Sequence, residues 1–172
     1  MKRPKESVGA PAPNEAGQSG SAKPAENRIL IVDDDSSVRE MLTRVLVGEG
    51  YLVWAAADGT VALEIAAAIK VDLVLLDLNM LGKNGWDTFD RLTAENPLLA
   101  VIIITARSNQ LFTALGTGAG ALLEKPLDFP KLLQTIRRLL AEPAESRLAR
   151  MAGRPADFHY VHAQHKEQKK QT

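Results

Sequence analysis

The segment Val71–Met80, with the sequence VDLVLLDLNM, predicts a buried strand that ends in a carboxylate. Every side chain from Leu73 to Leu76 is apolar, so both faces of the strand should be covered by helices, as in a parallel sheet. Asp77 then lies at the carboxyl end of the strand, which is the edge where open α/β sheets bind ligands. A lone aspartate in this place is more often a cap than a reactive group, so its function depends on what other strands bring to the same edge.

Strand and helix patterns alternate on both sides of this segment. The helix after the first strand can begin with a capping box of Ser37 and Glu40, and Gly48 or Gly50 can end it. Five strand and helix pairs predict one α/β domain with a five-stranded parallel sheet and helices on both faces, although the pattern leaves the strand order open. The expected strands are 29–32, 51–55, 73–77, 99–104 and 119–123.

Composition limits the classes of function. The 172 residues are 45% hydrophobic, carry no net charge and include no cysteine. The apolar fraction supports a packed core, and the charge balance gives no sign of a nucleic-acid or membrane partner. Without cysteine there can be no disulfide or thiolate site, which is compatible with a cytoplasmic location. The longest apolar run, Leu98 to Ile104, is too short to span a bilayer.

The ends of the chain differ in composition from its centre. Residues 1–27 are rich in Pro, Gly, Ala and Ser, which predicts a disordered leader before a domain over residues 28–141. Residues 142–172 predict a partly helical or disordered tail that is too short for a typical DNA-binding domain. We therefore expect a stand-alone protein that signals by protein contact, with nucleic acid an unlikely partner and no membrane association.

Polar side chains stand where the predicted strands end. Asp33 and Asp34 follow the first strand, Asp77 ends the third, Thr105 ends the fourth, and Lys125 follows the fifth. Carboxylates on one edge would repel one another, and a hard cation such as Mg²⁺ relieves this cost. Lysine supplies a positive charge for a phosphoryl oxygen, and threonine supplies a hydrogen-bond donor. The sequence therefore predicts a divalent-cation and phosphoryl site.

Four motifs resemble the receiver domains of two-component response regulators. The match covers about residues 28–141, and the motifs follow the order of that family, so the resemblance is far more specific than any one motif. It implies a doubly wound (βα)5 fold of the flavodoxin-like kind. The motifs are Ile29–Asp35, Leu73–Met80, Ile102–Ala106 and Glu124–Pro126.

The resemblance implies a metal site. Asp33 and Asp34 match the acidic pair that holds Mg²⁺, with Asp34 the more direct ligand and Asp33 acting partly through water. Asp77 belongs to the same shell, and Asn79 matches the position whose backbone carbonyl completes it.

The resemblance also implies a mechanism without turnover of an external substrate. Asp77 matches the aspartate that accepts a phosphoryl group from a histidine kinase or phosphotransfer protein. Lys125 matches the lysine that contacts the phosphoryl group, and a cis bond to Pro126 is implied after it. Thr105 matches the switch hydroxyl, and the surface of the fourth helix, fifth strand and fifth helix would report the change to a protein target.

Three positions depart from the family pattern. Leu122 stands where most receivers have Tyr or Phe, which puts the usual aromatic rotation in doubt. Leu81 replaces a frequent proline, and Arg107 lies two residues after the switch threonine. The substitution at Leu122 leaves open a receiver-fold interaction module that is largely independent of phosphorylation.

Two other motifs allow a different interpretation. Asp33 and Asp35 form an Asp-x-Asp pattern like that of phosphohydrolases with an aspartate nucleophile, but this alternative leaves Asp77, Thr105 and Lys125 unexplained. Residues 116–120, with the sequence GTGAG, precede a strand and therefore predict the end of a helix better than a phosphate-binding loop.

Overall fold

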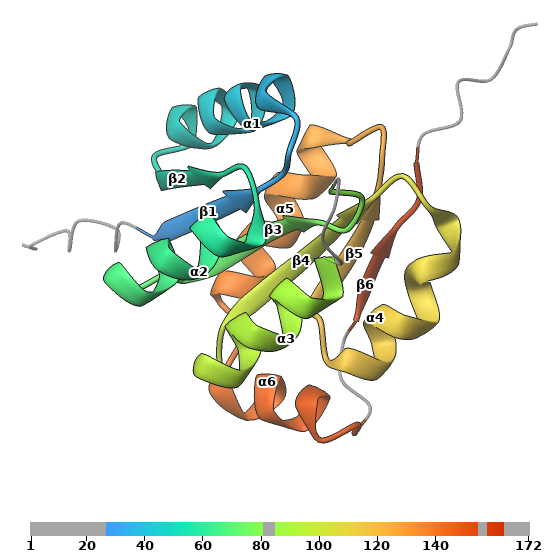
Figure 1. Ribbon diagram of the computed structural model, residues 1–172. Coiled ribbons are helices and arrows are strands. Elements are labelled where there is room, and N and C mark those ends of the chain that lie inside the picture. The colour runs from blue at the N-terminus through green and yellow to red at the C-terminus, as the bar shows by residue number, and fades with distance from the viewer. Residues whose placement is uncertain (1–26, 81–84, 155–157, 164–172) are drawn as a thin grey trace, which may run out of the picture.

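A six-stranded parallel sheet forms the centre of the protein, with the strand order β2-β1-β3-β4-β5-β6 (Figure 1). The computed structural model describes residues 27–80, 85–154 and 158–163. Each of the five expected strands is present within two residues of its predicted limits, and a sixth strand joins the edge of β5. The strands are β1 (Arg28–Val32), β2 (Leu52–Ala56), β3 (Leu73–Asp77), β4 (Ala100–Thr105), β5 (Ala121–Glu124) and β6 (His159–Val161).

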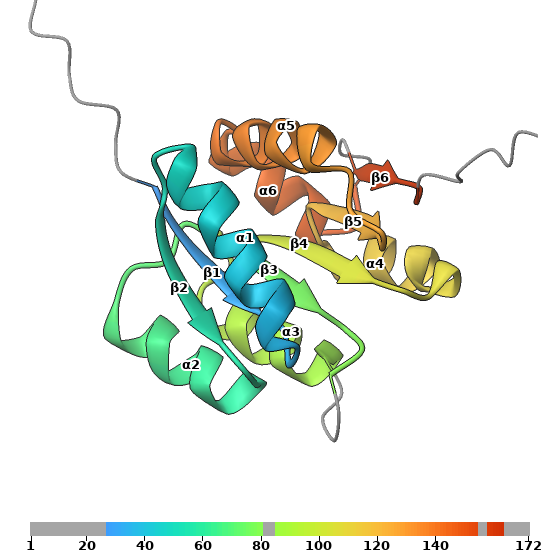
Figure 2. The ribbon, with the colours of Figure 1, turned by 90° about the horizontal axis from the view of Figure 1, so that it is seen from above.

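Helices cover both faces of the sheet, as the alternating pattern predicted (Figure 2). Apolar side chains of α2, α3 and α4 pack on one face, and those of α1 and α5 pack on the other. The helices are α1 (Ser36–Gly48), α2 (Gly59–Ala68), α3 (Gly85–Glu95), α4 (Leu111–Thr117), α5 (Phe129–Leu140) and α6 (Ala144–Met151), with a 3-10 turn, η1 (Ser108–Gln110), before α4.

Side chains of the central strands alternate between the two cores. In β3, Leu73 and Leu75 face α1 and α5, whereas Val74 and Leu76 face α2 and α3, and all four are fully buried. Burying one such side chain stabilises the fold by about 1.5–3 kcal/mol. This two-sided packing holds the backbone of β3 rigidly up to Asp77.

The first helix begins differently from the prediction. The Asp35 side chain accepts hydrogen bonds from the backbone N–H groups of Ser37 and Val38, so Asp35 caps α1 and the predicted capping box of Ser37 and Glu40 is wrong. Asp35 directly follows the loop from β1 in an extended conformation, which brings its short side chain to these free N–H groups. The helix ends at Gly48, and Gly50 takes a φ of +87°, as a glycine can.

The fourth helix is short and spans seven residues. It ends at Gly118, whose φ of +79° confirms that the GTGAG segment terminates a helix. Only Ala114 of this helix is buried, and the Phe112 side chain is 85% exposed. The helix is therefore attached to the sheet by a narrow strip of contacts.

The sixth helix attaches the segment that leads to β6 to the rest of the domain. Arg150 is buried, forms a two-pronged ion pair with Glu142, and donates from Nε to the carbonyl oxygen of Gly118. Arg147 donates to the carbonyl oxygens of Leu98 and Leu139. These bonds tie α6 to the chain segments that enter β4 and β5. The strand that follows α6 was not predicted, because three residues are too few to show a period in the sequence.

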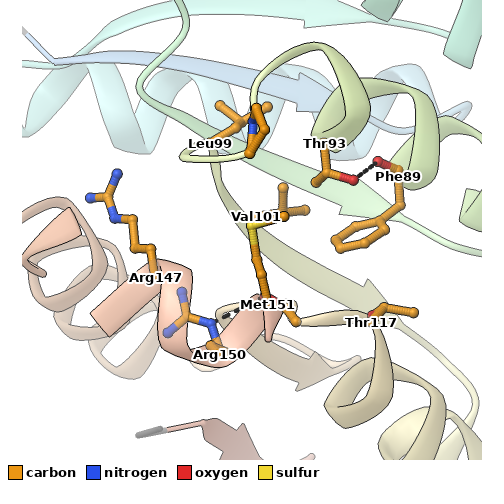
Figure 3. Close-up of a pocket in the computed structure, with 10 residues that line it drawn as sticks. Phe89, Thr93, Leu99, Val101, Thr117, Arg147, Arg150 and Met151 are labelled. Carbon is orange, nitrogen blue, oxygen red and sulfur yellow. Dashed lines mark hydrogen bonds between the residues drawn. The ribbon is translucent and has the colours of Figure 1, made fainter. Parts of the chain in front are cut away.

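A small cavity lies between α6 and the helices of the neighbouring face (Figure 3). Its volume of about 10 Å³ is enough for one water molecule and too small for an organic ligand. Met151 reaches into it beside Val101, with Phe89 and Thr117 on the opposite side. This cavity is a packing gap, not a ligand site.

Some predictions fall on residues outside this description. The predicted leader lies there except for its last residue, Asn27, and so does Leu81. Among the helices of the described part, none combines the length and the apolar character that crossing a bilayer requires.

Candidate functional site

Strand order places Asp33 and Asp77 side by side. β1 lies between β2 and β3, so the chain leaves β1 toward one edge of the sheet and later crosses to the other. The carboxyl ends at such a point of reversal form the usual ligand crevice of open α/β sheets. Asp33 follows β1 and Asp77 ends β3, and both residues are buried, at 2% and 3% exposure.

Lys125 lies between these two carboxylates. Its Nζ is 2.7 Å from Oδ2 of Asp77 and 3.1 Å from Oδ2 of Asp33. The residue follows β5, and its backbone N–H donates to the carbonyl oxygen of Thr105 at 2.8 Å. The bond between Lys125 and Pro126 is cis, as the resemblance implied. A positive charge thus stands next to the carboxylate that was predicted to react.

Thr105 is fully buried at the end of β4. Its Oγ1 accepts a hydrogen bond from the Arg107 backbone N–H at 3.0 Å and lies 3.4 Å from the side-chain nitrogen of Asn79. Asn79 also donates its backbone N–H to Oδ1 of Asp77 at 2.8 Å. The side-chain oxygen of Asn79 is buried without a partner among the described residues. Asn79 therefore connects Asp77 with Thr105 and presents an unused acceptor.

Three carboxylates can hold a metal ion together. Asp33, Asp34 and Asp77 each have a carboxylate oxygen within 4.8 Å of such an oxygen on both of the other residues. Oxygen ligands of this kind suit Mg²⁺, which keeps part of its water shell, and the exposed position of Asp34 leaves room for that water. The residues present therefore fit the predicted ion.

Burial and charge act against each other in this site. Burial raises the pKa of the Asp33 carboxyl above its usual value, although the N–H of Asp35 and the ammonium of Lys125 oppose the shift. Burial alone would lower the pKa of Lys125, but the bonds to Asp77 and Asp33 raise it above its ordinary value. The lysine thus remains charged, and the acidic cluster carries an electrostatic cost that a cation would remove.

Comparison with known proteins agrees with this geometry. The family model of the response regulator receiver domain matches residues 29–137. The chain belongs to this family. Members receive phosphoryl groups from histidine kinases on an aspartate and bind Mg²⁺ through an acidic pocket.

Curated relatives of the receiver are longer than the matched region. The DNA-binding response regulator MtrA of Mycolicibacterium paratuberculosis is 40% identical over 124 residues, which cover 69% of this chain and 55% of MtrA. The response regulator MprA of Mycolicibacterium vanbaalenii is 39% identical over 115 residues, which cover 66% of this chain and 50% of MprA. The chain thus spans about half the length of these relatives. Because MtrA is named as DNA-binding, the prediction that nucleic acid is an unlikely partner has no support here.

Solved structures show the same fold. The receiver domain protein of Methanospirillum hungatei has a TM-score of 0.64 and 28% identity, covering 66% of this chain and 93% of that one. The response regulator TrrA of Thermotoga maritima, solved with Mg²⁺ and BeF, has a TM-score of 0.62 and 30% identity, covering 66% and 98%. The flavodoxin-like receiver fold predicted from the motifs is confirmed.

All six residues predicted for the site lie at one edge of the sheet. Asp33, Asp77 and Lys125 are in direct contact, Asp34 shares the acidic cluster, and Asn79 bridges to Thr105. The sequence interpretation missed two features. One is Arg39 on α1, which donates to the backbone carbonyl of Asp33 at 2.7 Å. The other is the side chain of Asn79, because the sequence pattern assigned a role only to the backbone carbonyl of this residue.

Proposed function

We propose that Asp77 of this receiver accepts a phosphoryl group and that the protein signals through the resulting change in shape. The contact between Lys125 Nζ and Asp77 Oδ2 at 2.7 Å carries this proposal. A cation beside the attacking carboxylate neutralises charge on the incoming phosphoryl group, and phosphoryl transfer depends mainly on such positioning and neutralisation.

The proposed reaction moves a phosphoryl group from nitrogen to oxygen. A carboxylate oxygen of Asp77 attacks the phosphorus of a phosphohistidine on a kinase or phosphotransfer protein, and the phosphorus–nitrogen bond breaks. The imidazole nitrogen keeps the electron pair and takes up a proton, while Asp77 becomes an acyl phosphate. Water later hydrolyses this bond, so we propose no enzymatic turnover beyond the modification and its reversal.

Bound Mg²⁺ would supply charge neutralisation for the phosphoryl oxygens. Asp33, Asp34 and Asp77 would hold it, together with the backbone carbonyl of Asn79. Asp33 is fixed for this purpose, since its Oδ1 accepts from the backbone N–H of Asp35 at 2.9 Å.

Thr105 is the proposed switch. In the unmodified chain its hydroxyl oxygen is engaged by Arg107 and Asn79. A phosphoryl group on Asp77 would offer this hydroxyl a strong acceptor, and the difference between the two sets of contacts would shift the equilibrium between two conformations. The surface of α4, β5 and α5 would transmit the change to a protein target. The stand-alone arrangement and the cytoplasmic location stay predictions.

The donor protein must reach Asp77 from the edge of the sheet, and a groove beside α1 opens near that edge. Ser36, Arg39, Glu40 and Arg44 contribute to its lining, and its volume is about 460 Å³. Its mixed charges suit a polar, reversible contact. We propose that the kinase or phosphotransfer protein docks here.

Intact mass spectrometry tests the central proposal. Incubation with Mg²⁺ and acetyl phosphate should add one phosphoryl group to the wild-type chain, and Asp77→Asn should add none. Uptake that persists in Asp77→Asn would contradict the assignment.

A second function has one observation in its favour. Leu122 is fully buried in the core, so β5 lacks the aromatic ring that usually reports the switch. If the wild-type chain gains no mass under these conditions, a phosphorylation-independent interaction module becomes the better account. The phosphohydrolase alternative requires Asp33 as nucleophile, so labelling abolished only by Asp33→Asn, accompanied by release of phosphate with turnover, would favour it.

A further inference from the structure

The sixth strand lies on the outer edge of β5, which separates it from β4 and the proposed switch Thr105 (Figure 1). It pairs in parallel with β5 through three residues, with His159 opposite Ala121, Tyr160 opposite Leu122 and Val161 opposite Leu123. An edge strand of three residues is marginally stable by its backbone bonds alone. Side-chain contacts must therefore hold it in place.

Tyr160 supplies an aromatic ring beside Leu122. The two residues are register partners, and the ring packs partly buried against the same core as Leu122. The aromatic side chain that β5 lacks at this position is thus provided by the neighbouring strand.

The Glu124 carboxylate at the end of β5 accepts two hydrogen bonds from β6 and the residues after it. The Tyr160 hydroxyl donates a hydrogen bond to Oε1 of Glu124, and the backbone N–H of Ala163 donates to Oε2 at 3.2 Å. The hydrogen bond from the Tyr160 hydroxyl to Glu124, together with burial, raises the pKa of Tyr160 to about 12. The hydroxyl therefore keeps its proton throughout the neutral range. Hydrogen bonds to a carboxylate are among the stronger ones in proteins.

The same glutamate adjoins the phosphoryl site. Glu124 is the register partner of Thr105, and it directly precedes Lys125. Lys125 in turn holds Asp77, and its backbone N–H bonds to the carbonyl of Thr105. Any displacement of Thr105 and Lys125 toward a phosphoryl group therefore moves the strand ends to which Glu124 belongs.

We propose that β6 is an intramolecular ligand of β5 whose release reports phosphorylation, with the Tyr160–Glu124 contact as the latch. The proposal rests on Asp77 being the phosphoryl acceptor. Conversion of the Asp77 carboxylate into an acyl phosphate adds about one negative charge to the site and draws Lys125 and Thr105 toward the phosphoryl group. Both effects disturb the geometry that Tyr160 and Ala163 require. Three register pairs, the contact of His159 with Arg138 and the buried Val161 accompany the latch, so its loss weakens the docking of β6 and exposes the edge of β5 to a partner.

Hydrogen–deuterium exchange of the full chain tests the proposal. Amides of residues 159–163 should exchange about tenfold faster after incubation with Mg²⁺ and acetyl phosphate, as expected for loss of one strong hydrogen bond. Asp77→Asn should show no such increase. Tyr160→Phe, which removes only the hydroxyl, should show the faster exchange already without the phosphodonor, whereas the matched Tyr51→Phe should behave as wild type.

Three negative results have different meanings. A gain of one phosphoryl group in intact mass, with unchanged exchange over residues 159–163, would overturn the latch and leave the proposed function standing. Absence of any mass gain would overturn the proposed function and the latch together. Unchanged exchange in unmodified Tyr160→Phe would show that the hydroxyl does not hold β6 and would also overturn the latch.

Discussion

Lys125 links two buried carboxylates that would otherwise repel each other. Its side chain is 25% exposed, whereas those of Asp33 and Asp77 are nearly inaccessible. The residue thus stabilises the unmodified chain, and in the proposed function it also neutralises charge during phosphoryl transfer. The effect of removing Lys125 on the free energy of unfolding should therefore depend on whether Mg²⁺ is present.

Lys125→Met should destabilise the chain by about 2 kcal/mol in the presence of EDTA, because it leaves two buried carboxylates without their partner. Addition of Mg²⁺ should restore part of the loss, since the ion replaces the missing charge. Urea unfolding with EDTA and with Mg²⁺ measures both effects. The control is Lys70→Met, at an exposed lysine, which should change stability little in either condition. Equal losses in the two variants would contradict the assigned role.

Gly85 allows the first turn of α3 to lie close to the backbone of Asp77 and Leu78. A Cβ at this position would lie 2.7 Å from Cα of Leu78 and 3.0 Å from the carbonyl oxygen of Asp77, both backbone atoms that cannot turn aside. Gly85→Ala should therefore destabilise the chain by about 1–3 kcal/mol and slow phosphoryl uptake from acetyl phosphate. Unfolding and intact-mass time courses test this.

The matched control is Gly116→Ala in α4, where a Cβ meets no atom within 4 Å. Alanine favours the helix there by about 0.5–1 kcal/mol, so this variant should be slightly more stable. If Gly85→Ala is stable and takes up the phosphoryl group at the normal rate, the backbone at Asp77 and Leu78 adjusts freely to the added Cβ.

Among the secondary-structure elements, α6 and β6 lie outside the five strand and helix pairs of the receiver pattern. Arg150 anchors α6 through Glu142 and the Gly118 carbonyl. Arg150→Ala should lower the free energy of unfolding by about 1–3 kcal/mol, because the buried acceptors lose their donor. Urea unfolding measures the loss. Arg154→Ala, at an exposed arginine, should have little effect, and a similar loss in both variants would contradict a specific anchor.

Docking of β6 should depend on pH through His159. Burial, and then the guanidinium of Arg138 on α5, lowers the pKa of this histidine below its usual value of about 6.5. The docked strand therefore favours neutral His159, so the contribution to stability is present above pH ~6.5 and is lost as the pH falls through the lowered pKa. Nδ1 of His159 lies 2.9 Å from the Arg138 side chain, a contact that requires an unprotonated nitrogen.

Exchange over residues 159–163, corrected for the intrinsic pH effect on amide exchange, should accelerate between pH 7.5 and pH 5. His159→Gln, which cannot gain a charge in this range, should remove the dependence. A pH profile unchanged by this substitution would show that another group controls the strand.

For the molecule as a whole, Mg²⁺ should act as a stabilising ligand. An ion that binds only the folded chain raises the free energy of unfolding by about 2.7 kcal/mol at a hundred times its Kd. Thermal unfolding should therefore shift upward with Mg²⁺ and return with EDTA. Asp34→Asn should greatly weaken the shift because it removes an exposed member of the acidic cluster, whereas Asp90→Asn on the surface of α3 should retain it. An equal shift in both variants would place the ion elsewhere.

The sequence alone was sufficient for the receiver fold and for predicting that six polar residues meet at one edge of its sheet. Long apolar runs such as 29–32 and 73–76 predict strands buried on both faces, because burial depends on side chains that are neighbours along the chain. Parallel strands bring their carboxyl ends to one edge, so the polar residues that follow them could be assigned to one site before any distance was known.

Only the tertiary structure decided which groups make contact at that edge. Lys125 reaches Asp77 across 48 residues of sequence, and this pairing depends on strand order, which the pattern leaves open. Asp35 replaces the expected cap of α1 because the loop after β1 aims its side chain at the helix. Strand β6 is too short for a sequence period, so the ring of Tyr160 beside Leu122 follows from packing alone. Local composition determines which elements form, whereas contacts between distant segments require the assembled sheet.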